Sequence, residues 1–307
     1  MVVQYTDDEI RSVLLTLQRI RPAYGELLGF YRELFVAQNH VAAQDEPLAL
    51  PLDRDAAFQR LAKGLPLFSP EAFPLDPRAH EAFLQKVCDL AETAPDPLAG
   101  CAREVAAHLG KGTLDMGDLG HAALAEDSDA LARLAVELGV DGSALHLLLA
   151  SALAPLAARF ADKVATAFLA DAPAWKHGRC PICGRLPSLS SLADKGERKL
   201  ICGFCQHQWD APRFFCPACE TRDNGTLTYF FSEEEAEYRV YTCEGCRFYL
   251  KTVDLRLLGR PFYPPAEMLL TLHLDIQAQE QGFAAEGRER GDDSVWDSVF
   301  KKGVYPN

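Results

Sequence analysis

Apolar residues recur every three or four positions through most of residues 6–170, and Gly, Pro or short polar stretches separate the periodic segments. This spacing gathers apolar side chains on one face of a helix. Thr6 is expected to cap the first helix, because its hydroxyl can accept a hydrogen bond from the first turn. An apolar stretch over about 143–170 predicts the buried central helix of an all-α domain. The other predicted helices cover 6–21, 25–44, 53–64, 77–94, 96–110 and 127–139.

The pattern changes after about residue 172, where helical periodicity gives way to short β-rich runs. "TLTYFF" and "YRVYT" favour strands, and Asn224-Gly225 is typical of a hairpin turn. Further on, "AEMLLTLHLDIQAQEQG" predicts one amphipathic helix that ends at Gly282. The fold class expected is therefore α+β multidomain. Its parts are an all-α domain over 1–172, two small β-rich metal-knuckle units over 173–211 and 212–263, and a C-terminal helix with a polar tail over 264–307.

Four C-x-x-C pairs fall within 67 residues of the β-rich region, separated by gaps of 18, 10 and 23 residues. A redox dithiol of the thioredoxin type needs one pair at the start of a helix. Eight thiolates instead fill two tetrahedral four-sulfur metal sites with none left over. Pro181 and Gly184 suit a tight knuckle around the first pair, since Gly tolerates a left-handed backbone. The candidate metal ligands are Cys180, Cys183, Cys202, Cys205, Cys216, Cys219, Cys243 and Cys246.

The region reads as an internal repeat in which each unit opens with C-P-x-C and closes with C-x-x-C. Sequential pairing is therefore predicted. It places the ligands from Cys180 to Cys205 on one ion and those from Cys216 to Cys246 on another. An interleaved arrangement stays open, because spacing alone does not exclude it.

The chain is acidic, with a net charge of −13, and 48% of its residues are hydrophobic. An acidic chain is a poor nucleic-acid binder, so no nucleic-acid partner is expected. The acidic N-terminus does not resemble a signal peptide. The most apolar run, 143–158, is interrupted by His146 and Pro155 and followed by Arg159. A cytoplasmic protein without membrane insertion is therefore expected, in a reducing compartment that favours metal sites over disulfides.

Several other residues could carry chemistry but have simpler interpretations. Cys88 and Cys101 lie in predicted helices without a partner motif and are expected in the core. His146 is expected to be a buried core residue, and neither His177 nor His207 is needed to complete a ligand set. No nucleophile elbow, P-loop or dinucleotide motif is present. No catalytic or organic-cofactor-binding residue is predicted, and the protein is not expected to be an enzyme.

Five stretches together resemble one known family, over about residues 175–283. They read "WKHGRCPICGRLP", "GERKLICGFCQHQW", "FFCPACE", "YTCEGCRFYLKTVDL" and "LHLDIQAQEQGF". Their order, spacing and flanking residues are similar to those of the formate dehydrogenase accessory proteins, the FdhE family. Asp275 matches an Asp of the family's helix. The family's paired Asp and its Asn-Pro are replaced here by "YPPAEMLLTLHLD" and "DDSVWDSVF".

The resemblance implies a cytoplasmic accessory factor for maturation of respiratory formate dehydrogenase, a chaperone that binds the catalytic subunit before export. It also implies rubredoxin-like or zinc-ribbon-like units with two mononuclear metal ions. Iron is favoured by the resemblance, and zinc suits the same sulfur ligands.

Two alternatives to a client-binding assembly factor stay open. One is a rubredoxin-like redox or sulfur-handling protein acting on the same enzyme, and the other is a zinc-ribbon adaptor. The metal units are the expected client contact if Phe214, Phe215 and Phe248 are exposed. Burial in the core is the alternative for these three residues.

Overall fold

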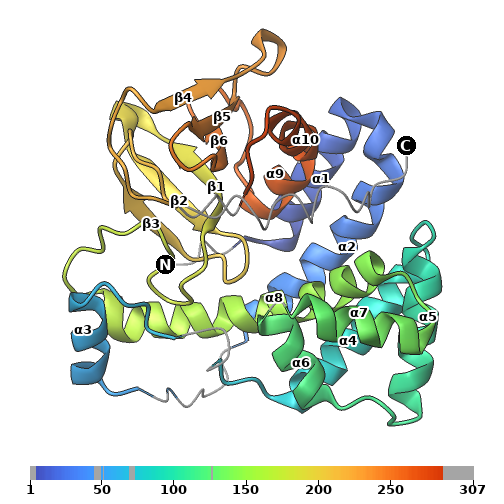
Figure 1. The fold of residues 1–307 in the computed structure, drawn as a ribbon. Helices are drawn as coiled ribbons and strands as arrows, with labels where there is room; N and C mark the ends of the chain where they lie inside the picture. The colour runs from blue at the N-terminus through green and yellow to red at the C-terminus, as the bar shows by residue number, and fades with distance from the viewer. Residues whose placement is uncertain (1–4, 45–49, 51, 69–72, 126, 286–307) are drawn as a thin grey trace.

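The structure is a computed structural model that describes residues 5–44, 50, 52–68, 73–125 and 127–285. Helices fill the N-terminal part and a mixed sheet follows, which confirms the predicted α+β multidomain class (Figure 1). The helices of the N-terminal part are α1 (Asp7–Ile20), α2 (Gly25–Ala42), α3 (Arg54–Ala62), α4 (Pro77–Ala91), α5 (Leu98–Gly110), α6 (Met116–Ala125), α7 (Ser128–Leu138) and α8 (Gly142–Val164).

The predicted cap of the first helix is present. The Thr6 hydroxyl accepts a hydrogen bond from the Glu9 amide, and the Glu9 carboxylate accepts one from the Thr6 amide at 2.8 Å. This reciprocal capping box satisfies backbone groups that a helix start leaves unpaired.

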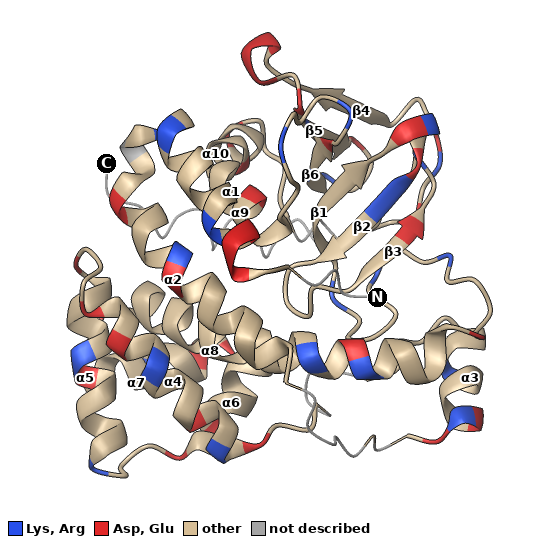
Figure 2. Cartoon of the chain, turned by 180° about the vertical axis from the view of Figure 1, so that it is seen from behind, with Lys and Arg blue, Asp and Glu red and all other residues tan. Residues whose placement is uncertain are grey.

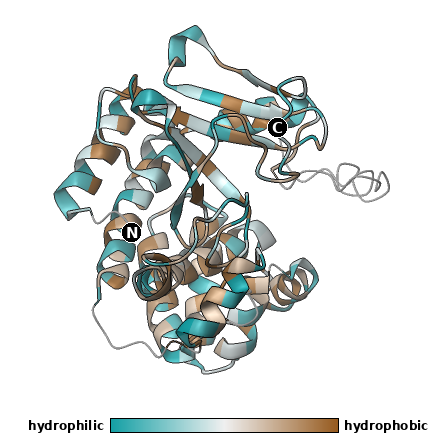
Figure 3. Cartoon of the chain, turned by 90° about the vertical axis from the view of Figure 1, so that its left-hand side faces the viewer, coloured by the Kyte–Doolittle hydropathy of each residue, from teal (hydrophilic) through white to brown (hydrophobic). Residues whose placement is uncertain are grey.

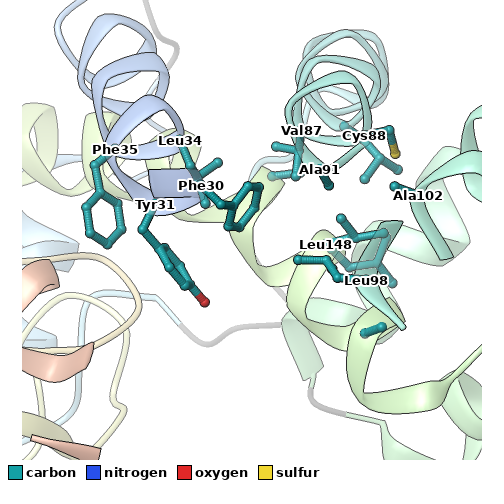
Figure 4. Packing of buried hydrophobic residues seen from close by; sticks show 14 of the residues in the cluster. Phe30, Tyr31, Leu34, Phe35, Val87, Cys88, Ala91, Leu98, Ala102 and Leu148 are labelled. Carbon is teal, nitrogen blue, oxygen red and sulfur yellow. The ribbon is translucent and has the colours of Figure 1, made fainter. Parts of the chain in front are cut away.

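Helix α8 is the predicted central helix, and a single turn of wider helix (165–169) extends it. Its first half meets α2, α4 and α5 in one core. Figure 4 shows Phe30 and Leu34 of α2, Val87 of α4 and Leu148 of α8 converging there. Hydrophilic positions lie mainly on the outer faces of the helices (Figure 3). Burying apolar area against several neighbours stabilises this domain.

Within the described ranges, residues 142–169 form the one helix whose length and composition would allow it to cross a membrane. Protein already covers 72% of its most apolar window. This burial is typical of a core helix rather than of a surface that faces lipid.

Sequence periodicity did not predict α6, which packs against α4 through a glycine. A Cβ at Gly120 would lie 2.1 Å from Leu75 Cδ2 and 3.1 Å from His80 Nδ1, so a larger residue there would force the Leu75 side chain to move. His80 of α4 is completely buried. Burial lowers the pKa of His80 from 6.5 to about 4, and an interaction with the Met116 backbone opposes this only in part.

We expect the helical domain to lose stability on acidification because of His80. In the folded chain His80 stays neutral down to about pH 4, whereas it gains a proton near pH 6.5 once unfolded. Its contribution is therefore complete above pH 6.5 and is lost as the pH falls toward 4, at a cost of about 3 kcal/mol. Urea unfolding at several pH values measures how the free energy of unfolding falls on acidification. This slope should be shallower for His80→Gln than for the wild-type chain. The exposed control His146→Gln should keep the wild-type slope, and equal slopes for all three proteins would contradict this prediction.

Six strands form one sheet in the order β3-β2-β1-β6-β5-β4. Each metal-knuckle unit supplies three consecutive antiparallel strands, and β1 pairs with β6 in parallel to join the two units. The Ser190 and Thr252 hydroxyls lie 2.6 Å apart across this junction. The strands are β1 (Pro187–Leu192), β2 (Arg198–Cys202), β3 (Gln208–Ala211), β4 (Leu227–Phe230), β5 (Tyr238–Cys243) and β6 (Tyr249–Asp254).

The two β-rich runs of the second unit form the hairpin of β4 and β5, but Asn224-Gly225 does not connect these strands. It lies in a turn before β4, where the Asp223 carboxylate accepts a hydrogen bond from the Gly225 amide at 2.9 Å. The hairpin instead turns through residues 231–237, and the acidic residues at its tip are coloured red in Figure 2. Asn224-Gly225 therefore forms a turn, but not the turn that joins β4 and β5.

The single C-terminal helix predicted over 266–282 is also wrong, because Thr271 breaks it into α9 (Pro264–Leu270) and α10 (Leu272–Glu280). Lys251 of β6 is buried, and its ammonium donates to the Met268 and Thr271 carbonyls at 3.2 and 3.3 Å and to Asp275 at 2.6 Å. Carbonyl groups at the break thus accept hydrogen bonds from the buried Lys251 ammonium of β6. Gly282 ends α10 with a φ of +77°, as predicted, and residues 286–307 of the polar tail lie outside the described residues.

The helical and sheet regions pack against each other through apolar side chains at more than one place. The C-terminal half of α8 packs against the metal-knuckle units in one apolar cluster that includes Phe160 and the paired cysteines. Helix α9 lies between α1 and the sheet (Figure 1), where Tyr263 packs on Tyr5 and Phe35. The units are therefore fixed on a helical base, and their cysteines are not free to move independently.

Candidate metal centre

All four C-x-x-C pairs adopt the same knuckle. In each, the amide of the fourth residue after the first cysteine donates to that cysteine's carbonyl, at 2.8–3.1 Å. The first cysteine's amide donates in turn to the carbonyl five residues later, at 2.9–3.0 Å. The second and fourth knuckles also form the connections from β2 to β3 and from β5 to β6. The sheet thus delivers two of the four pairs as the turns of antiparallel strands.

The turn residue of each knuckle has a left-handed backbone. Gly184 takes this place in the first knuckle with a φ of +75°, as the sequence predicted. Gln206, Glu220 and Arg247 take it in the others with φ of +57° to +58°. A non-glycine residue in this conformation costs roughly 1–2 kcal/mol. Three knuckles therefore have a strained turn residue. Because this residue is not glycine, the sequence carried no sign of its left-handed backbone.

The structure brings the sulfurs together in two groups that follow the chain order. Cys180, Cys183, Cys202 and Cys205 form the first cysteine group, and Cys216, Cys219, Cys243 and Cys246 form the second cysteine group. The shortest Sγ–Sγ separations are 3.5–3.7 Å in the first group and 3.5–3.8 Å in the second, and all four sulfurs of each group lie within 4.8 Å of one another. Metal–sulfur bonds of about 2.3 Å in a tetrahedron place sulfurs about 3.8 Å apart. Each group could therefore hold one metal ion.

The chemistry of the thiols also fits a cation. Burial raises the pKa of Cys180 and Cys205, while hydrogen bonds from neighbouring thiols hold that of Cys202 well below its usual value. In the second group, hydrogen bonding from Cys216 lowers the pKa of Cys246 to about 5. Four thiolates at these distances need a metal ion to offset their repulsion.

The two groups differ in their surroundings. The first knuckle is tied to the helical region, since the Leu67 and Phe68 amides each donate at 2.8 Å to the Pro181 and Ile182 carbonyls between its cysteines. All four cysteines of the first group are buried, whereas Cys219 of the second group is partly exposed. The second group is therefore the nearer of the two to the surface.

Direct contacts also join the two units. The Glu220 carboxylate, in the third knuckle, accepts a hydrogen bond from the Gly178 amide at 3.0 Å and lies 3.2 Å from His177 Nδ1. A Cβ at Gly178 would fall 2.0 Å from the Pro217 carbonyl oxygen, so only glycine permits this approach. The segment before the first knuckle is thus packed directly against the third.

No histidine joins the cysteine groups within the described residues. His207 is buried with its ring stacked on Trp209, at a centroid distance of 6.3 Å. His146 is exposed, so the expectation of a core position was wrong because the apolar helix turns this residue outward. Cys88 and Cys101 are buried in the helical core, as predicted.

The three aromatic residues considered as exposed contacts divide between surface and core. Phe215 and Phe248 are buried beside the cysteine groups, whereas Phe214 is 48% exposed. Sequence reasoning did not single out Tyr229 and Phe231, which are 48% and 49% exposed with rings 6.1 Å apart. Strand alternation could have marked them, since they lie on one face of the β4 segment.

The fold and the sulfur groups define a protein with two Cys₄ knuckle units on a helical base. No family model matches the chain. It is 29% identical over 268 residues to an FdhE homologue of Aquifex aeolicus, covering 85% of this chain and 87% of that protein. It is also 35% identical over 112 residues to an FdhE homologue of Haemophilus influenzae, covering 35% and 36% of the two chains.

A crystal structure of the FdhE protein from Pseudomonas aeruginosa has the same fold. Its TM-score is 0.66 at 23% identity, and the match covers 92% of this chain and 94% of that one. Similarity to FdhE proteins thus extends along most of the chain, through the helical region as well as the cysteine motifs. The resemblance to the FdhE family is confirmed.

Proposed function

We propose that the first and second cysteine groups each bind one metal ion through their four sulfurs. The observation that supports this is the tetrahedral spacing of the sulfurs in both groups. When bound, the ion would neutralise thiolate charge and hold the strands of its unit together. The chain's own part is to fix the four sulfurs on knuckles and to exclude water from most of them.

We divide the chain into a helical domain over 1–172, two metal units over 173–211 and 212–263, and a C-terminal segment over 264–307. The stability of each metal unit should depend on its own ion. Small β-rich units bury too little apolar surface to fold unaided, so metal binding contributes much of their stability. Iron is proposed from the family resemblance, and zinc is the alternative. Metal analysis of protein purified without air should find two ions per chain. A single ion, or disulfides in freshly reduced protein, would overturn the assignment.

We propose that the protein is an accessory factor for the maturation of formate dehydrogenase and binds its catalytic subunit in the cytoplasm before export. Similarity to FdhE proteins over most of the chain supports this role. No catalytic motif was found in the sequence, and a rigid surface suits recognition of a folded client better than turnover of a small molecule. We therefore propose a binding role rather than an enzymatic one.

The rubredoxin-like alternative, in which the metal changes the client chemically, is kept open by the partly exposed Cys219 of the second group. Iron that cycles between two oxidation states would favour a redox role, whereas zinc would exclude a redox role, because zinc has no redox chemistry. A nucleic-acid adaptor is disfavoured by the net charge of −13.

The second unit carries the proposed client-binding surface, which we define as Phe214, Tyr229 and Phe231. Phe214 and Tyr229 line the same cavity beside the second cysteine group, and Tyr229 lies next to Phe231. Strand β4 is at the edge of the sheet, so it can be approached from outside. Half-exposed aromatic side chains that cluster in this way are typical of recognition surfaces.

We expect serine at all three of these positions to weaken client binding by at least about tenfold while both metal ions stay bound. Aromatic anchors commonly contribute about 2 kcal/mol or more each. Co-purification of the formate dehydrogenase catalytic subunit with the tagged chain measures the effect. Val136→Ser, at an 83% exposed position on α7, is the matched control and should bind normally. Unchanged capture by the triple variant would place the client contact elsewhere.

A further inference from the structure

We infer that Arg198 is the buried counter-cation of the second cysteine group, and that its charge determines how tightly this group holds its metal ion. The inference rests on the proposed metal binding and goes beyond it, because it assigns a role to a residue that is not a ligand. Arg198 begins β2, in the first unit, yet it acts on the site in the second unit.

The first observation is a buried charge without a carboxylate partner. The Arg198 residue is only 3% exposed, and no carboxylate forms an ion pair with it in the part of the chain that the structure describes. Charged side chains are almost never buried so completely unless they are paired. Lys251, the other buried cation of the sheet, has its counter-ion in Asp275 at 2.6 Å. Arg198 therefore needs a negative charge that the described carboxylates do not supply.

The second observation is the position of the guanidinium. Its Nη1 donates to the Phe215 carbonyl at 3.0 Å, directly before Cys216, and to the Arg213 carbonyl at 3.3 Å. Its Nε donates to the Ser190 hydroxyl at 3.3 Å. These bonds fix the side chain at the entry to the third knuckle and leave its charge uncompensated.

The remaining nitrogen, Nη2, has no hydrogen-bond partner among the described residues. Arg198 lines a small cavity (≈ 20 Å³) together with Cys216 and Cys243, two ligands of the second group. The Tyr241 ring closes another side, with the guanidinium carbon 5.0 Å from its centroid. The unpaired charge thus borders the sulfur group across an apolar space.

The negative charge that balances Arg198 is that of the metal-bound second cysteine group. Four thiolates and one divalent ion carry a net charge of roughly −2, and a cation across a low-dielectric gap stabilises such a centre. Burial lowers the pKa of Arg198 to about 10, while Tyr241 and Cys216 act in the opposite direction, so the guanidinium stays protonated at neutral pH. Cys216 and Cys243 of the second group line the cavity that Arg198 borders, and no cysteine of the first group does, so the effect should be specific to one site.

The test uses the full-length chain loaded with both ions. Arg198→Met removes the charge at similar volume, and Arg198→Lys keeps the charge with different hydrogen bonding. Ion release to excess ethylenediaminetetraacetate is followed at constant pH. Cys180→Ser and Cys219→Ser chains, which should each keep one ion, assign the two release phases to their groups.

For Arg198→Met we expect the second-group ion to be held about 10–100-fold less tightly, the usual effect of losing a partner outside the ligand shell. The first-group ion should be unaffected. Arg198→Lys should restore most of the retention, which a purely structural role for the guanidinium would not do. Wild-type retention in Arg198→Met, or equal loss in Arg198→Lys and Arg198→Met, would overturn the inference.

If Arg198→Met does not fold, the result for Arg198→Lys alone tests the inference. Retention of both ions supports a role for the positive charge, and loss of the second-group ion refutes that role. A wild-type chain that holds fewer than two ions would instead overturn the proposed metal sites, and this inference with them.

Discussion

Cys180→Ser will remove one of the two proposed metal ions and leave the other bound. The first cysteine group loses one of its four sulfurs, whereas the second group keeps all of its own. A structural ion of this kind can contribute roughly 10–16 kcal/mol to folding, so the first unit should be severely destabilised. Intact-protein mass spectrometry under native conditions should count one ion per chain, and thermal unfolding should show an early transition.

Two matched variants make this result specific. Cys88→Ser changes a buried cysteine outside both groups and should keep both ions. Cys219→Ser should lose the second-group ion while the first, which is tied to the helical base, stays in place. Loss of both ions from Cys180→Ser alone would show that the units are strongly coupled. The Gly178 amide and the Glu220 carboxylate, 3.0 Å apart, are the contact through which such coupling would act.

Serine at all eight paired cysteines will reduce formate dehydrogenase activity in the cell to the level of a strain that lacks the gene. Without ions the two units cannot hold the sheet together, and the proposed client-binding surface is lost with it. The helical domain should still fold, because its main core, around the first half of α8, contains none of the eight paired cysteines. Formate oxidation in cell extracts and far-ultraviolet circular dichroism of the purified variant measure the two effects. A Cys88→Ser, Cys101→Ser double variant should keep activity, and substantial activity with all eight serines would disprove a role for the metal units.

Sequence periodicity predicted the helices that pack on α8 because each buries one continuous face. It missed α6, a ten-residue helix whose buried face is formed by Met116, Leu119 and Leu124 together with Gly120, a residue of low helix propensity. The break in the C-terminal helix at Thr271 also escaped prediction. At the break the Thr271 carbonyl accepts a hydrogen bond from Lys251, a residue of β6 that reaches the helix only in the folded chain.

At the candidate site, the cysteine spacing predicted the two groups and Gly184 predicted the left-handed turn of the first knuckle. The same turn at Gln206, Glu220 and Arg247 carried no signal, because the hydrogen bonds of the knuckle impose it on ordinary residues. The parallel pairing of β1 with β6 was equally hidden, since each unit reads as a self-contained repeat. Arg198 becomes notable only when the fold buries it beside sulfurs from the other unit.

Deletion of the gene tests the account's central claim most directly, with formate dehydrogenase and an unrelated exported molybdoenzyme assayed in the same strain. The account predicts that formate oxidation is lost, that the second enzyme keeps its activity, and that a plasmid copy of the gene restores the loss. Unchanged formate oxidation in the deletion strain would contradict the accessory role, and equal failure of both enzymes would show that the role is not specific to formate dehydrogenase.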